Sequence, residues 1–206
     1  NVVFDASLFN SRLDVSSEYF NNGSRDMLFP RPLATSTGAA SIPINVGTMI
    51  NKGLEIAINA DIVRSSKFTW NTRLNLTHLR NKITKVEGAD SLVSGFNQLA
   101  EGEPYGAFFV AKYAGVDPAD GQAMYYMADG TTTKDYGILT ADDRYYAGQP
   151  YRDLDGSITN TFTYKGFDLS FMVTFGIGGK FYDATYQNLM QTGSASLGQA
   201  WHVDML

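Results

Sequence analysis

The sequence predicts an all-β fold, a portion of an antiparallel transmembrane β-barrel, on three grounds. Residues 54–77 and 158–175 alternate apolar and polar side chains. Each of these segments is interrupted by a short turn, and aromatic side chains lie at the turn end of both. Because successive side chains point to opposite faces of a strand, both segments are expected to form hairpins with one apolar and one polar face.

The first strand region is expected at residues 2–20, where Leu13, Val15 and Tyr19 alternate with polar residues. A turn cluster of asparagine, glycine and serine follows it. Proline and glycine punctuate the rest of residues 21–53, so we expect a long loop there.

The first hairpin is predicted from strands at 54–63 and 68–78. Each apolar stripe runs for nine residues, close to the roughly 9–11 that a tilted strand needs to cross a bilayer. Ala60 and Thr72 share this face with the residues expected to contact lipid, which are Leu54, Ile56, Ile58, Ile62, Phe68, Trp70, Leu74 and Leu76. The opposite face would line a polar interior, or form a cross-strand ladder of hydrogen bonds, through Asn59, Asp61, Asn71, Arg73 and Asn75.

The second hairpin is predicted from strands at 157–164 and 167–175, joined by a Lys-Gly turn. Glycine accepts the positive φ that a two-residue turn requires. The lipid-facing residues expected on its second strand are Phe167, Leu169, Phe171, Val173 and Phe175. Rings near both turns, such as Trp70 and Tyr164, are typical of one rim of an aromatic girdle at a membrane surface.

Residues 78–156 are long and irregular, with a candidate strand at 108–113. A structureless loop of that length is unusual in a compact domain and indicates a function or a substructure of its own. Outer-membrane barrels have short turns on the periplasmic side and long loops outside. If the two short turns are periplasmic, residues 21–53, 78–156 and 176–206 all face outward.

Composition excludes several classes of protein. The 206 residues are 44% hydrophobic, which excludes general disorder, and no run approaches the roughly 18 apolar residues of a membrane helix. A net charge of -5 provides no basic field for nucleic acid. The absence of cysteine excludes disulfides and thiolate metal sites. Because the chain opens at Asn1 with no initiator methionine or signal peptide, we expect a piece of a longer protein.

Four segments form an ordered series of short motifs. Residues 45–55 read N-x-G-x-M-x-N-K-G-x-E, and residues 115–121 read G-V-D-P-x-x-G. Residues 163–170 read T-Y-K-G-F-D-L-S, and residues 178–183 read G-G-K-x-Y-D. In this order and spacing they resemble the SusC/RagA-like TonB-dependent outer-membrane transporters, and the resemblance covers most of the chain.

This resemblance implies a large barrel of about 22 strands, plugged by its own N-terminal domain, in the outer membrane of a Gram-negative bacterium. Such a barrel imports glycans or peptides with energy relayed by TonB, and a SusD-like surface lipoprotein sits over its outward loops. No TonB box or plug is present, and Leu206 is not the terminal aromatic residue of a closing strand. We therefore expect a C-terminal-region portion of the barrel.

Two groups of side chains in residues 78–156 are candidate sites. Flat rings with a hydroxyl suit contact with a ligand or a lipoprotein, although they could also pin the loop to itself, and they belong to Tyr125, Tyr126, Tyr145, Tyr146 and Tyr151. Family members often have a calcium loop where this chain has Asp129, Gly130, Asp135, Asp142 and Asp143. Because residues 131–134 interrupt the spacing of that loop, solvated carboxylates are favoured over calcium, and no cofactor or metal is expected.

Two classes of function follow from the residues. The favoured one is a portion of a nutrient importer, and the alternative is a soluble β-sandwich, a surface carbohydrate-binding module that buries its stripes against a second sheet. No Ser/His/Asp order and no carboxylate pair suggests catalysis, so we expect no enzyme. The two classes differ in what covers the apolar stripes.

Overall fold

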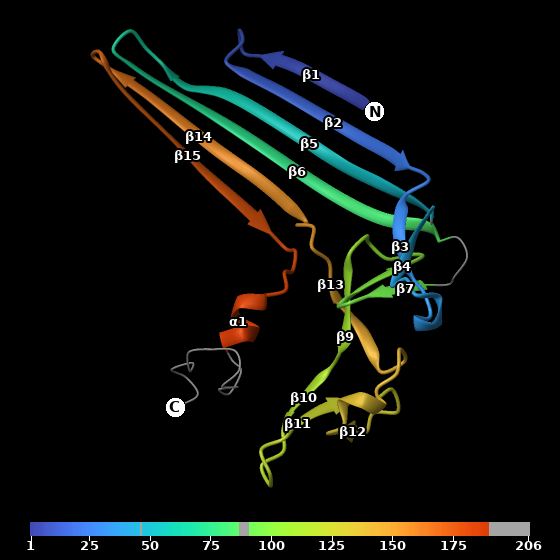
Figure 1. Cartoon of the computed structure of the whole chain (residues 1–206). Helices are drawn as coiled ribbons and strands as arrows, with labels where there is room; N and C mark the ends of the chain where they lie inside the picture. Colours follow the sequence, from blue (N-terminus) through green and yellow to red (C-terminus); the bar gives the residue numbers. More distant parts are fainter. Residues whose placement is uncertain (46, 87–90, 190–206) are drawn as a thin grey trace.

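The computed structural model describes residues 1–45, 47–86 and 91–189. Its main feature is one open antiparallel sheet, a single long layer that does not close on itself (Figure 1). The strands, in their order across the sheet, are β1 (Val2–Leu8), β2 (Leu13–Ser24), β5 (Gly47–Arg64), β6 (Phe68–Val86), β14 (Leu154–Tyr164) and β15 (Phe167–Ile177). The large antiparallel sheet agrees with the all-β class that the sequence predicts.

The register of this sheet gathers the apolar side chains on one face. Five apolar residues stand side by side across five strands, namely Val15, Ile58, Leu74, Ile158 and Val173. The next row along the strands is Asp14, Asn59, Arg73, Thr159 and Met172, which belongs to the other face. The alternation read from each hairpin is therefore continuous across the sheet, with one apolar and one largely polar face.

The first strand region, where at least one strand is expected, contains two. Residues 2–20 hold a hairpin of two strands, β1 and β2, joined by a turn in which Phe9, Asn10 and Ser11 all have a φ of 56°. This hairpin extends the apolar face, because Phe4 and Ala6 stand opposite Ser17 and Val15.

A bulge interrupts the alternation at the end of β5. Asp61 stands opposite Asn71, but Val63, and not Ile62, stands opposite Trp70. Ile62 is the extra residue of this bulge, so the strict alternation assigned to residues 54–62 ends at Asp61. Contact of Ile62 with lipid stays a prediction.

The central strands are longer than the apolar stripes. β5 begins at Gly47 and β6 ends at Val86, well beyond the expected limits of 54 and 78. The extension is largely polar on the face that continues the apolar band, where Lys52 stands opposite Arg80 and Lys82 stands opposite Ile50. Because this part of the face is largely polar, the alternation of apolar and polar residues did not predict the extra length of the two strands.

The expected long loops contain further structure. Residues 21–53 include β3 (Leu28–Pro32), η1 (Thr35–Thr37) and β4 (Ser41–Asn45). Residues 78–156 include the elements β7 (Ser91–Ser94), β8 (Asn97–Ala100), β9 (Ala107–Ala111), β10 (Tyr113–Val116), β11 (Ala123–Tyr126), β12 (Thr132–Thr133), η2 (Tyr136–Ile138) and β13 (Arg144–Gly148). They form a four-stranded sheet, β13-β9-β8-β7, and a three-stranded sheet, β10-β11-β12. The candidate strand at 108–113 corresponds to β9.

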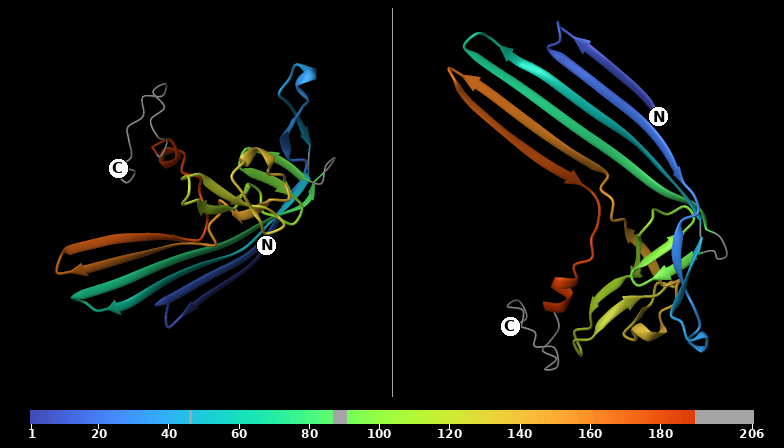
Figure 2. Two further views of the ribbon diagram at one scale, coloured as in Figure 1. Left: turned by 90° about the horizontal axis from the view of Figure 1, so that it is seen from below. Right: turned by 45° about the horizontal axis from the view of Figure 1, so that its top comes forward.

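The two ends of the large sheet differ. The hairpin turns after β1, β5 and β14 lie together at one end, and the small sheets lie at the other (Figures 1 and 2). The last described element, α1 (Ala184–Leu189), also lies toward the end that carries the small sheets. Of the segment 176–206, residues 190–206 lie outside the described residues. No helix in the described ranges is long and apolar enough to cross a membrane.

A small hydrophobic core joins the long strands to the four-stranded sheet. It consists of Ile83 and Val86 from β6 with Leu92 and Leu99 from β7 and β8. Ile83 is fully buried. Beside it, the buried Asn81 donates a hydrogen bond to Asn51 Oδ1 over 2.6 Å, and its own Oδ1 accepts one from the Tyr105 N–H over 2.6 Å.

The structure explains why two positions of the motif at residues 45–55 are glycine. Gly47 has a φ of 149° and lies so close to the Lys85 carbonyl oxygen that a Cβ atom would clash with it. Gly53 carries the Phe20 ring against its backbone, and the His78 carbonyl oxygen leaves no room for a Cβ atom. Both glycines therefore permit close packing of β5 against its neighbours.

Candidate functional site

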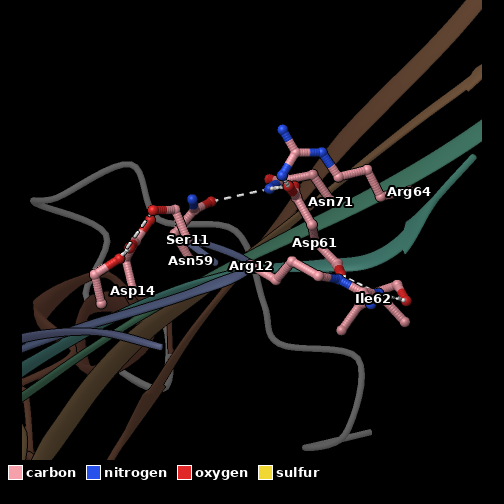
Figure 3. Close-up of polar contacts among 9 residues, drawn as sticks. Ser11, Arg12, Asp14, Asn59, Asp61, Ile62, Arg64 and Asn71 are labelled. Atoms are coloured by element: carbon pink, nitrogen blue, oxygen red, sulfur yellow. Dashed lines mark hydrogen bonds and ion pairs between the residues drawn. The ribbon is translucent and has the colours of Figure 1, made fainter. Parts of the chain in front are cut away.

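The polar face of the sheet carries a hydrogen-bonded cluster near the short turns (Figure 3). Asn71 Nδ2 donates to Asn59 Oδ1 over 3.0 Å and to Asp61 Oδ1 over 2.9 Å. Arg64 lies 3.8 Å from Asp61 Oδ2, and both are partly exposed, so this ion pair is weak. Three of the five residues expected on the polar face thus meet in one cluster.

Arg12 completes this cluster and was missed by sequence reasoning. Its guanidinium donates to the carbonyl oxygens of Asp61 and Ile62 over 3.1 and 3.2 Å (Figure 3). The Asp61 N–H donates to the Arg12 carbonyl over 2.8 Å. A bulge leaves backbone groups outside the strand ladder, and Arg12 satisfies two of them. Arg12 lies in a turn 49 residues away from Asp61, so only the register of the folded sheet could identify it.

We expect Arg12→Gln to loosen the bulge without unfolding the sheet. Both hydrogen bonds are solvent-exposed, so their loss should cost about 0.5–1 kcal/mol. Hydrogen exchange of the amides at residues 61–63 in the full-length protein should accelerate about two- to fivefold. Arg64→Gln, which removes only the weak ion pair, is the control. Equal effects of the two substitutions would show that Arg12 does not hold the bulge.

The other two residues expected on the polar face line a groove. Arg73 and Asn75 border a hollow of about 520 Å³ together with Asp5, Asp14 and Asn59. Asn75 Nδ2 also donates to Ser157 Oγ over 3.3 Å. The groove therefore presents a cation, amides and carboxylates on the same face, which suits contact with water, with a polar ligand or with another polar part of the protein.

The aromatic side chains near the short turns stack across the apolar face. Phe162 lies 5.6 Å from Trp70 and 6.1 Å from Phe171, measured between ring centroids. The Trp70 indole N–H donates to Asn160 Oδ1 over 2.9 Å, and the Thr72 hydroxyl donates to the same oxygen over 2.8 Å. Asn160 thus accepts hydrogen bonds from two donors on a face that is otherwise largely apolar. The polar group of a ring at a membrane boundary needs such a partner.

The loop tyrosines do not form one cluster. Tyr125, on β11, contacts the rings of Tyr113 and Tyr136 at 6.2 and 5.2 Å between centroids. Tyr126 lies under Lys112, whose Nζ is 5.2 Å from the ring centre.

Three other tyrosines lie on or beside β13. Tyr145 is 45% exposed, while Tyr146 packs on Phe109 and donates to Gln98 Oε1 over 2.7 Å. Partial burial raises the pKa of Tyr146 and of Tyr151. Tyr146 and Tyr151 therefore stay neutral near pH 7, and Tyr151 is less exposed than Tyr126, Tyr145 and Tyr146. Contact of any of them with a ligand or a lipoprotein stays a prediction.

The loop carboxylates are engaged in turns. Asp129 accepts hydrogen bonds from the Thr131 N–H and hydroxyl over 2.8 and 2.6 Å. Asp143 accepts from the N–H groups of Thr140 and Ala128. Asp135 accepts from the Gly137 N–H over 2.8 Å. Within the described ranges, no three acidic or histidine side chains gather as a metal site would require. The expectation that solvated carboxylates are favoured over calcium in this loop stays a prediction.

Lys134 joins two parts of the loop. Its Nζ lies 2.5 Å from Asp117 and 2.8 Å from Asp120, and Asp117 belongs to the motif at residues 115–121. Hydrogen bonds from Lys134 lower the pKa of both carboxyl groups below the ordinary value of 3.8. The same bonds raise the pKa of Lys134 above its ordinary value of 10.5.

The Lys134 contacts predict a pH dependence. Carboxyl groups with a lowered pKa stabilise the fold when the pH is above their ordinary pKa. This contribution is lost as pH falls through the lowered pKa. A lysine with a raised pKa stabilises the fold at any pH below its ordinary pKa. This contribution is lost only as pH rises through the raised pKa. Lys134→Met should therefore speed hydrogen exchange at residues 117–122 at pH 7, and this effect should fade as pH falls below 3.8 through the lowered pKa of the two carboxyl groups.

The control for this prediction is Lys112→Met, which removes a loop cation without touching Asp117 or Asp120. The measured quantity is the ratio of exchange rates between variant and unsubstituted protein at each pH. A ratio for Lys134→Met that stays constant from pH 7 down through the acid titration of Asp117 and Asp120 would contradict the assignment.

The chain is similar to known proteins. No protein-family model matches the chain. TonB-dependent receptor P3 of Formosa agariphila is 30% identical over 93% of this chain and 21% of its own length. TonB-dependent receptor SusC of Bacteroides thetaiotaomicron is 28% identical over 83% of this chain and 18% of its own length.

Solved structures agree with these relatives. The RagAB peptide importer in its closed-closed state matches 86% of this chain and 20% of the solved chain, with a TM-score of 0.74 and 25% identity. A structure of the RagAB peptide transporter matches with a TM-score of 0.72 and 26% identity. The chain spans about a fifth of the length of these proteins. By sequence and by fold, it resembles a portion of the SusC/RagA-like TonB-dependent receptors, and its large sheet is a portion of an antiparallel transmembrane β-barrel like theirs.

Proposed function

We propose that this chain forms part of the wall of an outer-membrane importer that takes up glycans or peptides with energy supplied through TonB. The observation that carries the proposal is the sheet with two unlike faces, apolar on one side and polar on the other across all its strands. A wall between lipid and a water-filled lumen needs this division.

The dimensions of the apolar face support contact with a bilayer. A stripe of nine residues at about 3.3 Å each, tilted by about 40°, is about 23 Å tall, close to the apolar band of outer-membrane barrels. The side chains of Phe167, Leu169 and Val173 are exposed, by 80, 60 and 54% of each residue. Within the described residues no second layer covers them, which a β-sandwich would require.

The ends of the sheet support an orientation. Short turns at one end and structured loops at the other are the pattern of a barrel whose turns face the periplasm. The loop tyrosines would then face outward, where a SusD-like lipoprotein would bind and deliver ligand. The solved structures that this chain resembles are described as a peptide importer, so a peptide is the first ligand to test.

The orientation of the two faces can be tested with single cysteines, because the 206 residues contain none. A spin label at Ile58 or Leu74 of the full-length receptor in lipid vesicles should be accessible to dissolved oxygen, which concentrates in lipid. A label at Asn59 or Arg73 should instead be accessible to a water-soluble nickel complex. Inaccessibility of the first two labels to both reagents would indicate a buried layer, as in the soluble β-sandwich, and would refute the proposal.

Transport and partnership require separate measurements on the complete receptor. Deletion of its gene should abolish growth on a peptide mixture, or on a glycan, as the limiting nutrient, and deletion of TonB should have the same effect. An affinity-tagged receptor should copurify a surface lipoprotein. Normal growth of the deletion strain on every peptide and glycan tested would contradict the import role, even if the labels confirm lipid contact.

A further inference from the structure

A cluster of cations lies on the apolar face of the sheet, just beyond its apolar band. Lys52 stands directly opposite Arg80, and Lys82 follows Arg80 on the same face. The row before them is Tyr19, Leu54 and His78, the end of the band. The cluster is at the end of the sheet that carries the structured loops.

These cations form no ion pair with the described residues. Lys52, Arg80 and Lys82 are exposed, and within the described ranges none of them forms an ion pair or a hydrogen bond through its side chain. Like charges placed directly opposite each other on neighbouring strands are destabilising. The pairing of Lys52 with Arg80 therefore has an electrostatic penalty that an external anion would remove.

The cluster borders a built pocket. A hollow of about 380 Å³ is lined by Lys52, Arg80 and Lys82, together with Pro104 and Asp153 from the loop segments. His78 Nδ1 contacts the Asp153 carbonyl oxygen over 2.5 Å and fixes one wall. Three cations against one carboxylate leave the pocket positively charged, on a chain whose net charge is -5.

The depth of the pocket matches that of lipid headgroups. Lys52 is two residues beyond Leu54, about 7 Å along the strand from the edge of the apolar band. The headgroup layer on each side of a bilayer is about 5–8 Å thick. A phosphate group at that level would meet the side chains of Lys52 and Arg80, and guanidinium and ammonium groups bind phosphate strongly.

We propose that Lys52, Arg80 and Lys82 form a binding site for the phosphorylated headgroup of an outer-leaflet glycolipid. The site rests on the membrane orientation proposed above, but it does not depend on which nutrient is imported. It would anchor the outer surface of the barrel at a fixed height, while the loops above remain available to the cargo.

The test uses the full-length receptor in detergent, with lipid A and enzymatically dephosphorylated lipid A as probes, and native mass spectrometry as the readout. Unsubstituted receptor should retain lipid A and release the dephosphorylated form. Lys52→Gln with Arg80→Gln should weaken retention about 25-fold, because each cation near an anionic headgroup contributes about a factor of five. Exchanging the two residues, as Lys52→Arg with Arg80→Lys, should preserve retention and show that charge, and not folding, is responsible.

The matched control is Lys67→Gln with Lys165→Gln, which removes two cations at the opposite end of the sheet and should leave lipid A retention unchanged. Equal retention of lipid A by the Lys52 and Arg80 double variant and the unsubstituted receptor would overturn the proposal. So would displacement of lipid A by millimolar inorganic phosphate, which would identify a site for the free ion. The spin labels at Ile58 and Leu74 report lipid contact independently, so failure of this site is distinguishable from failure of the membrane orientation.

Discussion

Replacing Leu74 by arginine is expected to destabilise the inserted barrel by about 2–4 kcal/mol. Leu74 stands between Ile58 and Ile158 in the middle of the apolar band. An arginine there would place a charge in hydrocarbon, because the side chain lies far from both edges of the band. The measurement is reversible urea unfolding of the full-length receptor in lipid vesicles, followed by its shifted mobility in unheated gels.

Asn75→Arg is the matched control, since Asn75 is adjacent in sequence and belongs to the opposite face. It lines the groove that already contains Arg73, so its effect should stay within about 0.5 kcal/mol. If Leu74→Arg and Asn75→Arg change the unfolding free energy equally, the two faces do not differ in solvent and the transmembrane assignment fails. The comparison needs no knowledge of ligand or partner.

The large sheet could be predicted because the alternation of apolar and polar residues that indicates it lies within each strand. In the hairpin of β14 and β15 each strand carries a period of two, and a two-residue turn fixes which residues are opposite. A sheet that separates two solvents must maintain this period over the whole thickness of the membrane. The faces of Leu74 and Asn75 therefore follow from a window of about ten residues in each strand.

The loop region could not be predicted for the opposite reason. Its strands are two to five residues long, as in β9 and β12, and so short a strand shows no clear periodicity. Its contacts are also remote, since the Phe96 ring stacks on Tyr182 at 4.2 Å between centroids. The tyrosines could be recognised as a dense group in the sequence, but their division between β11 and β13 depends on these remote pairings.

The candidate site on the polar face was predictable only in part. Asn59, Asp61 and Asn71 follow from alternation, and hydrogen bonds join them. Arg12 and the basic pocket at Lys52 do not follow from it, because both depend on which strands are neighbours. Charged residues at such positions look like ordinary solvated residues until the register is known.

Ile83→Ala is expected to release the four-stranded sheet from the ends of β5 and β6. Ile83 is fully buried against Val86, Leu92 and Leu99, and truncation of such a side chain costs about 2–5 kcal/mol. The core is small, so few other contacts compensate for the cavity. Hydrogen exchange at residues 97–100 of the full-length receptor should accelerate at least about 30-fold, the factor that corresponds to 2 kcal/mol.

Exchange in β14 and β15 should not change, because their hydrogen bonds belong to the membrane-spanning part of the sheet and not to this core. Val93→Ala provides the control on the same small sheet, since Val93 is 39% exposed and its truncation leaves little cavity. Faster exchange in all strands after Ile83→Ala would mean that the loops and the barrel wall unfold as one unit. Because the core joins them through only a few side chains, we expect the loops to open while the wall stays folded.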